Sequence, residues 1–199
     1  MLQKPDLAIF KNLSQSGDDW IVYHTSLGAT KRLKLNSNVV PDSQTSQFND
    51  TEPTSSLFTI GTYDNINKLN DNYISYLWAD VPGLQKFGSY EGNNDSDGVF
   101  VELGFRPAIL WVKNIDTTGS WYVLDDARDK FNNTFRTLNP NQSAQEDVVT
   151  GASGYCDFLS NGFKARISAN SINGSYTYIY CAWAHQPMNN LFGGQSNAR

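Results

Sequence analysis

The sequence has few of the residues that usually carry catalysis or bind metal ions. It contains two cysteines and two histidines among 199 residues. A structural zinc site or a secreted disulfide framework uses more ligands or cysteine pairs than these. A disulfide between Cys156 and Cys181 stays geometrically open, but two buried thiols are the favoured interpretation. The composition therefore predicts no metal and no cofactor.

Charge and long apolar runs are also scarce. Charged residues make up 18% of the chain and the formal net charge is −5. A general nucleic-acid binder would show a basic stripe, so we expect no nucleic acid as a partner. No apolar stretch approaches the roughly 20 residues of a membrane-spanning helix. The opening residues MLQKP hold no signal-peptide core, so we expect no membrane association and no secretion step.

Polar uncharged residues and aromatic residues are abundant instead. Aromatic side chains account for 13% of the chain. The polarity comes from Asn, Ser, Thr, Gln and Gly, which favour turns over helix interiors. This composition is typical of an all-β protein with many connecting turns.

One nine-residue segment occurs twice in similar form. Residues 106–114 read RPAILWVKN and residues 4–12 read KPDLAIFKN, an offset of 102 at both ends (106 − 4 and 114 − 12). Further pairs follow in order: WIVYH at 20–24 with WYVLD at 121–125, YISYLWA at 73–79 with YIYCAWA at 178–184, and Pro82 with Pro187. Loops tolerate changes in length better than strands, which explains an offset that drifts by a few residues.

The repeat predicts an all-β protein of two similar β-sandwich-like units from an internal duplication. Copy one covers residues 1–82, a bridging β-hairpin covers 83–105, and copy two with its C-terminal tail covers 106–199. We expect the two units to pack through the bridge.

Periodicity places the strands and the excursions between them. We expect strands at residues 7–11, 20–25, 57–63 and 73–79 in copy one, 84–90 and 99–103 in the bridge, and 120–125, 155–159, 163–167 and 175–184 in copy two, with long surface excursions over 27–56 and 127–149.

Copy one lacks a counterpart of the strand before Pro107. We expect a strand from a partner subunit to fill this gap by β-augmentation, with the bridge as the alternative. We expect neighbouring subunits to hold the polar tail 188–199 and the N-terminal residues as well.

Asn93, Asp95 and Asp97 resemble the first half of a calcium-binding loop. The glutamate expected at the twelfth position is absent, and Gly104 stands there. An Asx-rich turn is therefore the favoured interpretation, and these three residues are a weak calcium candidate.

Two arrangements could suggest an enzyme. Asp125, Asp126 and Asp129 could supply paired carboxylates for glycoside cleavage, but a charged turn in which Arg128 pairs with Asp125 is favoured. His24 and His185 could belong to a catalytic triad, but no nucleophile elbow accompanies them. We therefore expect no enzymatic activity.

Trp78 and Trp183 could stack on sugars. They occupy equivalent positions of the repeat, so we expect core residues that occur twice.

Several phrases of the second half resemble a known family. These are GFRPA at 104–108, VK at 112–113, TGSW at 118–121, Asp125 with Arg128, DFLSNGFKAR at 157–166, TYIY at 177–180 and NAR at 197–199, with KFGSYEGN at 86–93 as lead-in. They are similar to a domain of unknown function found in virion proteins of marine tailed phages, notably cyanophages. The resemblance covers the last 115 residues or so well and copy one more loosely, and it carries no catalytic residues.

The resemblance implies a virion structural protein, assembled in the host cytoplasm. Relatives often extend a longer fibre-like chain, whereas here the two units stand nearly alone. We therefore expect a capsid-decorating (cement) protein that binds the major capsid protein and self-associates as a homo-oligomer. A tail or tail-fibre component is the alternative, with host-surface glycans as a ligand that this alternative would allow.

Overall fold

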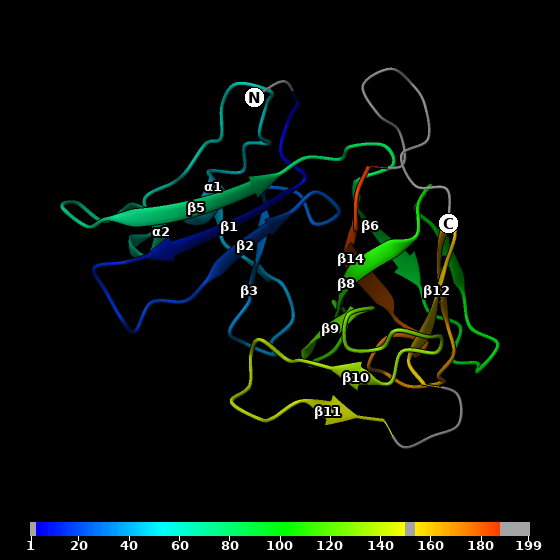
Figure 1. Ribbon diagram of the computed structural model, residues 1–199. Coiled ribbons are helices and arrows are strands. Elements are labelled where there is room, and N and C mark those ends of the chain that lie inside the picture. The colour runs from blue at the N-terminus through cyan, green and yellow to red at the C-terminus, as the bar shows by residue number, and fades with distance from the viewer. Residues whose placement is uncertain (1–2, 150–153, 188–199) are drawn as a thin grey trace.

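The computed structural model describes residues 3–149 and 154–187, and antiparallel strands dominate it (Figure 1). Fourteen strands and two four-residue helices make up the regular structure of these residues. The all-β fold class predicted from the sequence is confirmed. None of the helices in this part of the chain has the length and hydrophobicity to cross a bilayer.

The first sheet has five strands in the order β4-β3-β2-β1-β5. Its strands are β1 (Leu7–Asn12), β2 (Ile21–His24), β3 (Lys31–Lys34), β4 (Asp42–Ser43) and β5 (Tyr73–Trp78). Pro5 lies before β1, where its missing N–H costs the ladder nothing. Alternate side chains of β1 point to the two faces, and both faces are buried.

The second sheet has the order β6-β14-β8-β9. Its strands are β6 (Gln85–Glu91), β8 (Pro107–Asn114), β9 (Trp121–Asp125) and β14 (Thr177–Ala184). A bridge between Val123 and Leu138 joins β10 (Arg136–Thr137) to β9, and β11 (Asp147–Val148) pairs with β10. The strand order thus continues from β9 to β11.

Five strands of each half pair in the same order and register. Leu7 faces Trp78 between β1 and β5, and Ile109 faces Trp183 between β8 and β14. The correspondence extends to the shortest strands. Arg32 faces Asp42 between β3 and β4, and the equivalent Thr137 faces Asp147 between β10 and β11 (32 + 105 and 42 + 105).

A loop hydrogen bond is repeated too. Asn36 Oδ1 accepts from the backbone N–H of Trp20 at 3.0 Å, and Asn141 Oδ1 accepts from that of Trp121 at 2.9 Å. This is the arrangement that the sequence repeat predicts, while its origin by duplication stays a prediction.

The two sheets pack face to face and share one core. Its buried residues come from both sheets: Leu7, Ile9, Val22 and Leu33 from the first, and Phe87, Trp121, Ile179 and Cys181 from the second. The rings of Trp78 and Trp183 meet edge to face at 6.1 Å, and both are partly buried and pack against this core. The bridge that we expected to join the two units supplies part of this contact through Phe87 of β6, and other strands of the two sheets supply the rest.

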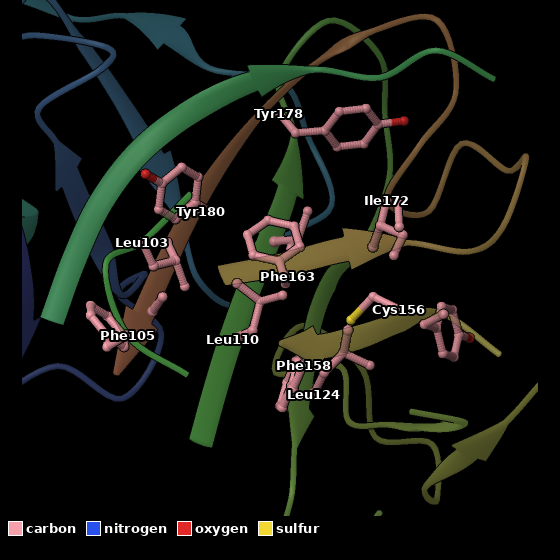
Figure 2. Packing of buried hydrophobic residues seen from close by; sticks show 14 residues of the cluster. Leu103, Phe105, Leu110, Leu124, Cys156, Phe158, Phe163, Ile172, Tyr178 and Tyr180 are labelled. Atoms are coloured by element: carbon pink, nitrogen blue, oxygen red, sulfur yellow. The ribbon is translucent and has the colours of Figure 1, made fainter. Parts of the chain in front are cut away.

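The outer faces of the two sheets are covered differently. The second is covered by a three-stranded sheet of β12 (Cys156–Leu159), β13 (Gly162–Ala165) and β7 (Phe100–Glu102). Figure 2 shows this packing, in which Phe158 and Phe163 lie against Leu110 and Tyr180. The first is covered by α1 (Thr45–Phe48), α2 (Asp64–Asn67) and the coil between them. The chain's own residues thus form the layer that we expected a partner strand to supply.

The predicted hairpin over residues 83–105 was wrong. Both strands exist, but β6 pairs with β14 and β7 pairs with β13, so they belong to different sheets. β6 buries Phe87 at its edge, and Leu103, directly after β7, is buried as well; both are 4% exposed.

The excursions and one predicted strand also differ from expectation. Residues 27–56 and 127–149 contain β3, β4, β10 and β11 rather than irregular coil alone. Residues 57–63 form no strand, because Gly61 and Tyr63 donate their N–H groups to carbonyls of α1. Gly61 permits this approach, since a Cβ there would lie 2.1 Å from the Ser46 carbonyl oxygen. The expected anchoring of the tail and of residues 1–2 lies outside the described residues.

Candidate functional site

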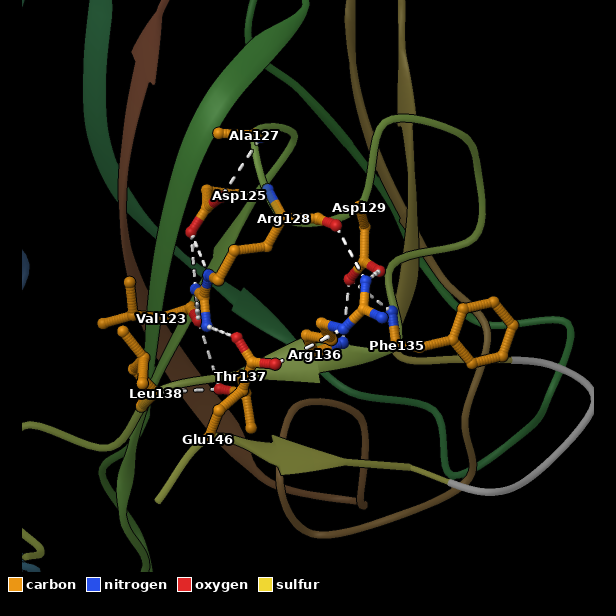
Figure 3. A network of polar contacts seen from close by, with 10 residues as sticks. All are labelled: Val123, Asp125, Ala127, Arg128, Asp129, Phe135, Arg136, Thr137, Leu138 and Glu146. Atoms are coloured by element: carbon orange, nitrogen blue, oxygen red, sulfur yellow. Dashed lines mark hydrogen bonds and ion pairs between the residues drawn. The ribbon is translucent and has the colours of Figure 1, made fainter. Parts of the chain in front are cut away.

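A network of charged side chains fixes the excursion that follows β9 (Figure 3). Asp125, at the end of β9, accepts hydrogen bonds from the backbone N–H groups of Ala127 and Arg128 and from Arg128 Nε at 2.5 Å. Arg128 also donates to the carbonyl oxygen of Val123 at 2.9 Å. The predicted pairing of Arg128 with Asp125 is confirmed.

The same network reaches β10 and β11. Asp129 accepts from the backbone N–H groups of Phe135 and Arg136, both at 2.8 Å. Glu146, just before β11, pairs with Arg128 at 3.4 Å and with Arg136 at 3.3 Å. Each carboxylate therefore holds a segment of the loop in place.

The structure does not bring the predicted paired carboxylates together as a free catalytic dyad. Asp126 turns to other partners, Arg106 at 2.6 Å and His185 at 2.9 Å. Asp125 and Asp129 are engaged as described above. These contacts give the three aspartates separate cationic partners, as in a structural charge network.

The ribbon of β10 and β11 carries an exposed apolar surface. Arg136 faces Val148, and Leu138 lies two residues further on the same side of the strand. Val148 is 48% and Leu138 44% exposed, and Phe131 in the preceding loop is 85% exposed. We name Phe131, Leu138 and Val148 the ribbon surface. The ion pairs of Arg128 and Arg136 with Glu146 hold the two strands of the ribbon together beside these residues.

His24 is fully buried between the two sheets and is not paired with His185. Its Nδ1 accepts from the N–H of Ser26 at 3.1 Å, and its Nε2 lies 3.1 Å from the carbonyl oxygen of Tyr180. A carbonyl only accepts, so Nε2 carries the proton and the ring is neutral. Burial lowers the pKa of His24 to about 4. This histidine joins the sheets and has no nucleophile beside it among these contacts.

Cys156 and Cys181 are free and buried, as the favoured interpretation predicted. Burial raises the pKa of the Cys156 thiol to about 12, and it raises that of Cys181 as well. Both therefore stay protonated and unreactive at neutral pH.

The loop of Asn93, Asp95 and Asp97 forms successive Asx turns. Asn93 Oδ1 accepts from the N–H of Asp95 at 3.1 Å and from Asn173 Nδ2 at 2.8 Å. Asp97 pairs with Lys164 at 2.9 Å, and this contact lowers the pKa of its carboxyl. Amide and ammonium donors of the protein thus occupy these oxygens. Among the described residues no cluster of three or more His, Cys, Asp or Glu could hold a metal ion.

Lys113 is a residue that the sequence reasoning missed. It is fully buried at the end of β8, and its Nζ donates to the carbonyl oxygens of Asn114 at 2.8 Å and Asn38 at 3.4 Å. Burial lowers its pKa to about 8. A signal was present in the repeat, which has Lys-Asn at the end of both strands. Lys11 makes the equivalent bond, to the carbonyl of Asn12 at 2.7 Å.

Comparison with known families gives one match. The model of a family described as "Domain of unknown function (DUF7483)" matches residues 1–187. The chain belongs to this family. The DUF7483 match spans both five-stranded arrangements, so the family is defined over the pair and not over one copy. No curated protein and no solved structure matches the chain.

Proposed function

We propose that the protein is a virion structural component of a tailed bacteriophage that decorates the capsid by subunit–subunit binding. The ribbon surface is the observation that carries this proposal. It presents Leu138 and Val148 to solvent on a ribbon held by ion pairs, and Phe131 in the loop that leads to the ribbon. Large exposed apolar side chains with polar neighbours are typical of protein interaction sites. The resemblance of the second half to virion proteins is the reason for proposing a phage particle as the assembly in which this surface binds.

The mechanism would be binding without chemistry. A preformed surface loses little conformational entropy on association, so the buried apolar area contributes more fully to affinity. The polar groups around the ribbon are engaged in holding its shape, which leaves Phe131, Leu138 and Val148 for the partner. The major capsid protein is the proposed partner, with self-association between neighbouring copies on the shell.

The first test is the location of the protein in purified phage particles. Quantitative mass spectrometry and labelled antibodies should place it on the head at a copy number comparable to that of the major capsid protein. A few copies at the tail would favour a tail or tail-fibre component instead. Absence from the particle would refute both assignments.

The second test concerns the surface itself. Exchanging Phe131 and Val148 for Asp should weaken binding to undecorated capsids at least about tenfold, because apolar anchors dominate such interfaces. Leu69→Asp is the matched control, since Leu69 is as exposed as Phe131 (86% and 85%) but lies in the other half. Equal binding by the ribbon variant and the control would refute the ribbon as the docking surface.

A further inference from the structure

β5 is the last strand of the first sheet, and one side of it carries backbone groups without partners (Figure 1). It pairs with β1 alone, in one continuous register. The carbonyl of Asn72, just before β5, accepts from the N–H of Leu13 on the β1 side. Backbone groups alternate in direction along a strand, so those of Tyr73, Ser75 and Leu77 point away from β1. Among the described residues, none bonds to these outward groups.

The β5 edge has none of the features that usually stop a strand edge from pairing with another chain. Such features are charged residues, proline, a bulge or a very short strand. β6 is protected by Asp80, whose Oδ1 accepts from the N–H of Phe87 at 2.8 Å, while β4 and β11 have only two residues each. β5 has six residues, YISYLW, without charge, proline or register shift. A further strand can therefore add to it.

The second half shows what kind of segment covers such an edge. β14 corresponds to β5, and β6 pairs antiparallel along it with Phe87 opposite Cys181. Cys181 is fully buried, whereas Tyr76, at the equivalent position of β5 (181 − 105), is 43% exposed. The Tyr76 ring stacks on that of Trp78 at 6.1 Å, at the rim of the shared core. An antiparallel strand with an apolar residue opposite Tyr76 would complete this rim as β6 does in the second half.

β5 itself has the pattern that this position requires. A twofold axis normal to the sheet pairs two copies of a strand antiparallel and keeps each side chain on its own face, so one residue lies opposite its own copy. With the axis at Ser75, Tyr73 lies opposite Leu77 of the second copy (73 + 77 = 75 + 75), and all outward groups of both strands are paired. Ile74 then lies opposite Tyr76, which is a favourable cross-strand pair of a β-branched and an aromatic residue. Moving the axis to Ile74 or Tyr76 leaves Leu77 or Tyr73 without a partner inside β5.

The charges that flank β5 are compatible with this register. Asp71 lies opposite Ala79 of the second copy, and Asp80 lies opposite Asn70 (71 + 79 and 80 + 70, again 150). Like charges directly opposite each other would destabilise the pairing, and here each aspartate faces an uncharged residue. Because the strand is neutral throughout, a second β5 meets no electrostatic penalty along its length.

We propose that two copies of this chain associate through their β5 edges around a twofold axis at Ser75, which joins their first sheets into one sheet of ten strands (5 + 5). This inference deepens the self-association in the proposed function by naming its surface. It rests on that function only for the place of the dimer on a particle, so experiments on the protein in solution test it separately. A contact of one strand is small beside a standard interface, and we expect a monomer–dimer equilibrium that becomes more favourable where copies are held close together.

Sedimentation and hydrogen exchange of the intact protein test the dimer and its location. Sedimentation should show a dimer that forms with increasing concentration. The outward amides of Ser75 and Leu77 should exchange at least about tenfold more slowly in the dimer than in the monomer, whereas those of Ile74 and Tyr76 bond to β1 in both and should change little. A monomer at all concentrations up to about 1 mM, or a dimer with unprotected Ser75 and Leu77 amides, would overturn the proposal.

A charge at the axis should dissociate the dimer. Ser75→Lys sets two ammonium groups opposite each other, and we expect the dimer Kd to rise at least about tenfold. Ser96→Lys is the matched control, because it makes the same change at another exposed serine, in the second half. Equal dimerisation by the two variants would contradict pairing at Ser75.

A disulfide reports the register. Residues opposite each other in a hydrogen-bonded pair have Cα atoms about 5.5 Å apart, which a disulfide can span. Ser75→Cys should therefore form a covalent dimer on oxidation, detected by non-reducing electrophoresis. Leu77→Cys should do so at least about tenfold more slowly, because it lies opposite Tyr73 and not opposite its own copy. Equal rates for the two variants would overturn the axis at Ser75.

Discussion

The two halves have the same strand order and register, but different structures cover the outer faces of their sheets. The first is covered outside by short helices and coil, whereas the second is covered by another sheet. Equivalent residues also differ in burial within the core that the two sheets share. Trp121 is 1% exposed and donates its Nε1–H to the carbonyl of Lys34 at 3.0 Å, while Trp20 at the equivalent position is half-buried. The two halves thus share their strand register, but a residue's contribution to stability depends on how completely its own side chain is buried.

Truncating the two equivalent tryptophans should give the largest difference in stability between the two halves. Trp121→Ala removes a fully buried ring and a cross-sheet hydrogen bond, and we expect it to lower the free energy of unfolding by about 3–5 kcal/mol. Trp20→Ala should cost about 1–2 kcal/mol, since its ring is partly solvated in the folded state. Urea denaturation measures both. Equal losses would mean that the two sheets contribute alike to the shared core.

Acid should destabilise the protein through His24, which is buried between the two sheets. The folded-state pKa of His24, about 4, lies below its ordinary value of 6.5. The unfolded state therefore binds the extra proton first, so stability falls as pH decreases from 6.5 to about 4, by up to about 3 kcal/mol.

The variant His24→Gln should lose this part of the pH dependence, measured as the difference from wild type in urea midpoints at pH 7 and pH 4.5. His185→Gln is the control, because His185 is mainly exposed (63%). If wild type and His24→Gln show parallel pH profiles, His24 is not held neutral between the sheets.

At high pH, replacing Lys113 should change the pH dependence of stability, whereas replacing the equivalent Lys11 should not. Burial lowers the pKa of Lys113 from 10.5 to about 8. Between these values the unfolded state binds more protons, so stability rises with pH, by about 2 kcal/mol from pH 7.5 to 9.5.

Lys113→Met should flatten this rise, whereas Lys11→Met should keep it, because Lys11 is only half-buried. Urea denaturation across this pH range measures the difference. A rise that persists in Lys113→Met would place its origin in another group.

The sequence allowed most strands to be predicted, but not β3, β4, β10 and β11, which lie in the two expected excursions. β1, β5 and β14 were recognised from apolar alternation and from the repeat. β4 and β11 have two residues each, and their sequences DS and DV carry no periodic signal. Their pairing depends on β3 and β10 already lying in the sheet, which is a long-range effect.

In the candidate site, local contacts could likewise be predicted from the sequence, and long-range contacts could not. The Asp125–Arg128 pair could be predicted because it is local, three residues apart in one turn. The environments of His24 and Lys113 could not, since the carbonyl oxygens of Tyr180 and Asn38 reach them from distant segments. The hairpin prediction failed for a related reason: adjacency in sequence favoured β6 with β7, while burial favoured two other edges.

The cross-sheet bonds of His24 and Trp121 have a practical consequence. A recombinant fragment ending after β5 would place Leu7, Ile9, Val22 and Leu33 in water and leave the His24 imidazole without its acceptor. We therefore expect the first half to be unstable when expressed alone, so biochemical work on this protein should begin from the intact pair.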